Sequence, residues 1–148
     1  MLALALAAAG AGAAYYYYFV GLDHADHHIV ISAEDLYAAM KQEDDTPIVV
    51  NVLSKETYDD AHIQGSINIP LGEIEDATHD WPKDKHIVVY CASYQCPASK
   101  EAAKQLRRAG FTRVYAYEGG TKEWLEKTTE GQFPEFPVMG PKEKSYLR

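Results

Sequence analysis

The sequence has few cysteines and fewer basic than acidic residues. It contains only two cysteines, close together in the chain, so it lacks the disulfide framework that supports small secreted domains. Its 14 Lys and Arg residues against 22 Asp and Glu residues give a net charge of −8, which excludes the basic surface that nucleic-acid binding needs. The same charge gives no general attraction for anionic substrates, so any anion site has to be local.

Residues 1–22 lack charged side chains altogether. A stretch of about 20 apolar residues can span a membrane, and the tyrosines at 15–18 would then lie at its interface. The small residues at 11–13 also fit a signal-peptide cleavage motif. No Lys or Arg flanks the segment, so a soluble N-terminal extension is a third interpretation. We favour a membrane-anchored or exported (periplasmic) protein over a cytoplasmic one.

Residues 23–28 read Asp-His-Ala-Asp-His-His, and both residue types are common metal ligands. No further ligand cluster follows to complete a coordination shell, so we interpret the segment as a solvated linker and expect no metal. One globular domain is expected over residues 29–138, followed by a tail at 139–148.

Within this domain, short apolar runs typical of buried strands alternate with segments of helical periodicity. We expect strands at residues 29–31, 48–53, 67–69, 87–90 and 113–117. Ser32 and Ser54 are suitable N-caps for the helices that follow the first two strands. The alternation predicts an α/β fold, a central parallel five-stranded sheet with helices on both faces, and the chain from residue 131 is expected to be irregular.

Cys91 directly follows the apolar strand at 87–90. A polar loop from Cys91 to Cys96 then leads into a helix that starts near Pro97. In open α/β sheets, ligands bind at this carboxyl edge, and a helix N-terminus there favours an anion. The pattern therefore predicts an exposed Cys91 with a lowered pKa that acts as a nucleophile. The alternative is a small cysteine buried in the core.

Three other segments contain distinctive residues at fixed spacing. They are residues 58–70, in which His62 precedes Gly65, residues 117–120, which Trp124 follows, and residues 131–134. Together with the Cys91 loop they resemble, in order and spacing, the rhodanese (sulfurtransferase) family. The resemblance covers about residues 29–138.

This resemblance implies that Cys91 takes a sulfane sulfur from a small donor or a protein persulfide and passes it to a thiol or another nucleophile. The loop amides of Ala92, Ser93, Tyr94, Gln95 and Cys96 would form a cradle of N–H donors around the sulfur. No cofactor is implied. The implied partners are the sulfur donor and the thiol acceptor, with a membrane reached through residues 1–22 as a further possibility.

The sequence also departs from the family. The loop carries no Lys or Arg, which puts thiosulfate as the donor in doubt, and Asn51 stands where relatives have Asp. Cys96 is either a space-filling side chain or a resolving thiol for a Cys91 persulfide. Asn51, His62 and Glu118 are expected to support the pocket, Asn51 through neutral hydrogen bonds only. A structural hydrogen bond for His62 and a solvated carboxylate for Glu118 are the simpler interpretations.

Two rival functions remain. Cys-based phosphatases and arsenate reductases share the architecture, but they need an Arg where this chain has Pro97. A non-catalytic binding or redox-sensing module would use the Cys91/Cys96 pair as a switch. Sulfur transfer requires an accessible thiolate, so a Cys91 sulfur buried away from solvent would argue against the transferase and leave only a shared scaffold.

Overall fold

The centre of the domain is a five-stranded sheet in the order β1-β6-β5-β2-β4, and every pairing in it is parallel. This confirms the predicted fold class. The strands are β1 (Ile29–Val30), β2 (Ile48–Asn51), β4 (Ile67–Asn68), β5 (His86–Tyr90) and β6 (Arg113–Tyr117).

This computed structural model describes residues 29–140. The predictions for the apolar segment 1–22 and the linker 23–28 lie outside the described residues, as does the tail at 141–148. Among the helices of the described residues, none combines the length and the apolar character that crossing a membrane requires.

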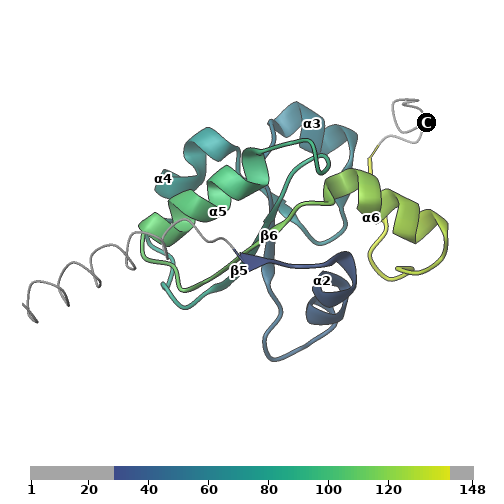
Figure 1. The fold of residues 1–148 in the computed structure, drawn as a ribbon, viewed down its shortest axis with the longest axis horizontal. Helices are drawn as coiled ribbons and strands as arrows, with labels where there is room; N and C mark the ends of the chain where they lie inside the picture. Colours follow the sequence, from purple (N-terminus) through teal and green to yellow (C-terminus); the bar gives the residue numbers. More distant parts are fainter. Residues whose placement is uncertain (1–28, 141–148) are drawn as a thin grey trace, which may run out of the picture.

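Helices cover both faces of the sheet, with α4 and α5 on one face and α2 and α6 on the other (Figure 1). The helical segments are α2 (Ala33–Met40), α3 (Lys55–Asp60), the 3₁₀ turn η1 (Leu71–Glu73), α4 (Ile74–Thr78), α5 (Ala98–Arg108) and α6 (Gly120–Thr129). Ser32 accepts the N–H of Asp35 and Ser54 accepts the N–H of Thr57, as the predicted N-caps require.

The side chains of β5 alternate between two apolar layers, because neighbouring residues of a strand point to opposite faces. Ile87 and Val89 pack with α4 and α5, whereas Val88 and Tyr90 pack with α2 and α6 around Trp124. Cys91 continues the alternation into the layer beneath α5. The strand therefore aims the cysteine toward the helix that follows its own loop.

The chain after residue 131 was expected to be irregular, and this is wrong at one point. Val138–Met139 forms β7, which pairs antiparallel with β3 (His62–Ile63) as a separate two-stranded sheet. The backbone N–H of Gln64 extends the contact to the carbonyl of Pro137 at 2.9 Å. A pairing between two segments so far apart in the chain leaves no local signal in the sequence.

Candidate active site

The loop of residues 91–97 joins the central strand β5 to α5 at the carboxyl edge of the sheet. It folds back on itself, since the N–H of Cys96 donates to the carbonyl of Ser93 at 2.9 Å. The hydroxyl of Ser93 also donates to the Gln95 side chain at 2.9 Å. Pro97 precedes the first residue of α5, so the predicted start of this helix is confirmed within one residue.

The first turn of α6 fastens the start of this loop. The N–H groups of Thr121 and Lys122 donate to the carbonyls of Cys91 and Ala92 at 3.1 and 3.0 Å. A helix has no internal acceptor for its first N–H groups, and here the loop supplies two. Gly120 lies against the same loop backbone with a φ of +64°.

The Cys91 thiol is buried, with none of the residue's surface exposed to solvent. Its Sγ lies 3.2 Å from the carbonyl oxygen of Cys96, 4.0 Å from that of Ser93 and 3.6 Å from the Ser99 hydroxyl. The expectation of an exposed thiolate in a cradle of loop amides is therefore wrong. The turn at residues 93–96 directs carbonyl oxygens at the sulfur, and a carbonyl accepts a proton donor rather than stabilising an anion.

The expected lowering of the Cys91 pKa is wrong for the same reason. Burial raises the pKa of the Cys91 thiol, and a hydrogen bond with the Cys96 side chain raises it further. The hydroxyl and the N–H of Ser99 act in the opposite direction, because both can donate to a thiolate. In this arrangement Cys91 is a neutral thiol at physiological pH.

We expect the alkylation rate of Cys91 to rise with pH through its ordinary pKa of about 8.5 without levelling off there. Only the thiolate reacts, and the raised pKa of Cys91 moves its formation to higher pH. The measurement uses iodoacetamide on Cys96→Ser, which leaves a single thiol, with glutathione as the reference thiol. A plateau below pH 8 would contradict the raised pKa.

The predicted loop residues lie together, and Cys96 is half-buried beside Cys91. Glu118 follows β6 and forms an ion pair with Lys100 of α5 at 3.0 Å. Its side chain is only 18% exposed, so the interpretation as a fully solvated carboxylate is wrong. The pair joins the residue after β6 to the first turn of α5. It also neutralises Lys100, the cation that follows the Cys91 loop in the sequence.

Asn51 and His62 have other partners within the described residues. The buried Asn51 accepts the N–H of Leu53 at 2.9 Å, and its Nδ2 has no hydrogen-bond partner there. His62 stacks on the ring of Tyr58, with centroids 3.9 Å apart, and its Nδ1 lies 2.7 Å from the Tyr58 carbonyl oxygen. These contacts match the structural hydrogen bond considered for His62.

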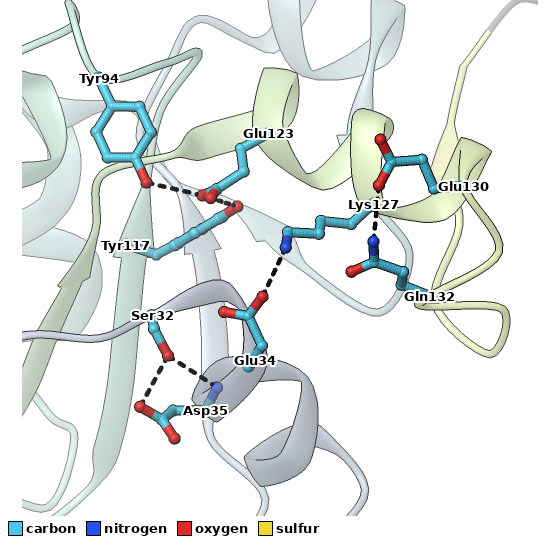
Figure 2. Close-up of polar contacts among 9 residues, drawn as sticks. All are labelled: Ser32, Glu34, Asp35, Tyr94, Tyr117, Glu123, Lys127, Glu130 and Gln132. Carbon is cyan, nitrogen blue, oxygen red and sulfur yellow. Dashed lines mark hydrogen bonds and ion pairs between the residues drawn. The ribbon is translucent and has the colours of Figure 1, made fainter.

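Two features of the site were missed from the sequence. One is Ser99, which is buried and lies against the Cys91 thiol. The other is Glu123, whose Oε2 accepts the hydroxyls of Tyr94 at 3.1 Å and Tyr117 at 2.9 Å (Figure 2). A serine in the first turn after a cysteine loop is a local cue for Ser99, whereas nothing local relates Tyr94 to Glu123.

Comparison with known proteins identifies the kind of domain. The family model of the rhodanese-like domain matches residues 32–127. The structure of the BH2092 protein from Bacillus halodurans is 31% identical, with a TM-score of 0.64 over 87% of this chain and 85% of that chain. The human single-domain sulfurtransferase TSTD1, at 23% identity and a TM-score of 0.61 over 68% of this chain and 98% of that one, supports the fold alone.

Two curated relatives have names that refer to sulfur chemistry. The putative sulfur carrier protein YrkF of Bacillus subtilis is 31% identical over 111 residues, 73% of this chain and 59% of YrkF. The thiosulfate sulfurtransferase GlpE of Coxiella burnetii is 26% identical over 77 residues, 52% of this chain and 70% of GlpE. The chain spans 33% to 59% of the length of three of the relatives it matches, YrkF among them.

Proposed function

The chain belongs to the rhodanese-like domain family, and on that premise we propose that it is a sulfurtransferase that carries a sulfane sulfur as a persulfide on Cys91. The Cys91 thiolate attacks the outer sulfur of a donor persulfide, the S–S bond of the donor breaks, and the donor leaves as a thiolate. An acceptor thiolate then attacks the outer sulfur on Cys91, and the Cys91 thiolate leaves.

The contact between Cys91 and Ser99 carries this proposal. Ser99 lies in the first turn of α5 with no exposed surface, so its position is fixed by packing. Its hydroxyl and N–H both favour the Cys91 thiolate over the thiol. Donors already placed at a developing anion cost little reorganisation when the charge forms.

The burial of Cys91 requires that transfer proceeds through an open form of the loop. A donor cannot reach a sulfur with no exposed surface, so residues 93–96 have to move before reaction. Moving them also removes the carbonyls of Ser93 and Cys96 from the sulfur and leaves Ser99 in place. The open form would thus hold the thiolate better than the closed one.

The charges around the loop bear on the donor. Residues 92–96 contain no cation, and Lys100 is paired with Glu118. Thiosulfate is a dianion, and desolvating it is unfavourable without a matching cation. We therefore propose a persulfide on a small thiol or on a protein as the donor rather than thiosulfate.

Cys96 is proposed as a resolving thiol. Its thiolate would attack the inner sulfur of the Cys91 persulfide, expel hydrosulfide and leave a Cys91–Cys96 disulfide. The contact of the Cys91 thiol with the Cys96 carbonyl at 3.2 Å supports this step, because it places the two cysteines side by side across the turn. The burial of Cys91 also favours a second candidate, a non-catalytic redox module in which the same pair is oxidised by an external disulfide without carrying sulfur.

Sulfur transfer and redox switching change the mass of the protein in different ways. We expect incubation with glutathione persulfide to add one sulfur to the Cys96→Ser variant, in which the persulfide is not resolved, and thiosulfate to add it about tenfold more slowly, the effect of one missing charge-assisted hydrogen bond. Intact mass spectrometry without reductant measures both, with mercaptopyruvate as a third donor and Cys96→Ser to trap the persulfide. No gain from any donor, together with a loss of two hydrogens on oxidation, would favour the redox module.

A further inference from the structure

We propose that Tyr94 and Glu123 form a latch that holds the loop closed over Cys91, and that both act through the loop to limit access to the sulfur. Tyr94 lies at the tip of the loop, between the two residues whose carbonyls cover the sulfur. Its hydroxyl donates to Glu123 of α6, 29 residues further along the chain (Figure 2). The role of the latch in sulfur transfer rests on the proposed function, whereas its test measures only how fast Cys91 can be reached.

The two ends of the latch differ in mobility. The Glu123 carboxylate also accepts the hydroxyl of Tyr117, which is buried at 1% exposure. It occupies the space beside Gly119, where a Cβ would overlap its Oε2. Tyr94, by contrast, is 60% exposed. The carboxylate is therefore the fixed end, and Tyr94 is the end that leaves when the loop opens.

The loop is anchored on either side of Tyr94. Upstream, the carbonyl of Ala92 is fastened to the N–H of Lys122, and downstream α5 begins after Pro97. Between these points the hydrogen bond from the Cys96 N–H to the Ser93 carbonyl closes the turn, so we expect the turn to move as one unit. Breaking the bond from Tyr94 to Glu123 would release this unit and uncover the sulfur.

The test is the alkylation rate of Cys91 by iodoacetamide, measured in a Cys96→Ser background without any sulfur donor. Tyr94→Phe and Glu123→Ala should each raise the rate about tenfold, the effect of losing one hydrogen bond to a charged acceptor. Glu123→Gln should give an intermediate rate, because its amide oxygen still accepts the hydroxyl. Glu126→Gln, the same change on an exposed residue of α6, should leave the rate unchanged.

The double variant Tyr94→Phe/Glu123→Ala separates a latch from general loosening. If the two residues act through one bond, the double variant reacts no faster than Glu123→Ala alone, whereas independent effects would multiply. Equal rates for the parent and Tyr94→Phe would overturn the proposal, as would multiplied effects. Because no donor is present, a chain that never accepts sulfur can still confirm the latch, and the two failures stay distinguishable.

Discussion

Replacing Cys91 by serine should abolish the gain of sulfur from every donor while the chain remains folded. The hydroxyl of serine cannot form a persulfide, so the reacting atom is lost outright. The fold should tolerate the change, because the hydroxyl can donate to the Cys96 carbonyl that the thiol now faces at 3.2 Å. We expect the free energy of unfolding to fall by less than about 2 kcal/mol.

Cys96→Ser is the matched control for this prediction, since it makes the same chemical change in the other thiol of the loop. It should gain one sulfur and keep it, because the persulfide can no longer be resolved to the Cys91–Cys96 disulfide. Intact mass measures both outcomes, and thermal unfolding of each variant checks the fold. Sulfur found on Cys91→Ser would place the carrier at Cys96 and contradict the proposed role of Cys91.

Much of the fold could be predicted because the signals that determine it are local. The apolar run that became β5 and the serine that caps α2 each act within a few residues, and the structure places both close to where the sequence does. The parallel sheet then follows from the alternation of strands and helices. The position of Cys91 at the end of the central strand could be predicted on the same basis.

The state of the Cys91 sulfur could not be predicted in this way. A helix N-terminus after the loop indicates an anion site only if N–H groups point at the sulfur, and that depends on the backbone angles of residues 93–96. Here the turn brings two carbonyls to the thiol instead, and burial raises its pKa. The sequence places the residue, whereas the orientation of a few peptide groups decides its protonation.

The contacts that hold the loop were missed for a different reason. Thr121 and Glu123 lie about 30 positions after the loop residues that they bind, and they meet them only because β5 and β6 are neighbours in the sheet. A single sequence contains no signal for contacts between residues this far apart in the chain. The close approach of Gly120 to the Cys91 loop is evident only from the structure.

Replacing Gly120 by alanine should strongly destabilise the domain and displace the Cys91 loop. A Cβ there would lie 2.5 Å from the carbonyl oxygen of Cys91 and 2.6 Å from the backbone nitrogen of Ser93, distances that real Cβ contacts do not show. Both atoms belong to the backbone, so no side chain can rotate away. The φ of +64° adds strain for any residue with a Cβ. We expect a loss of about 2–5 kcal/mol in the free energy of unfolding.

Gly131→Ala separates the two causes of this loss. Gly131 has a similar φ of +76°, but a Cβ there meets nothing within 4 Å. It should therefore lose only the conformational part, about 1–2 kcal/mol, in urea unfolding. The Gly120 variant should also show faster alkylation of Cys91, because relieving the overlap moves the loop or the start of α6, whereas the Gly131 variant should not. Equal stability losses in the two variants would mean that α6 does not press on the loop as closely as the distances indicate.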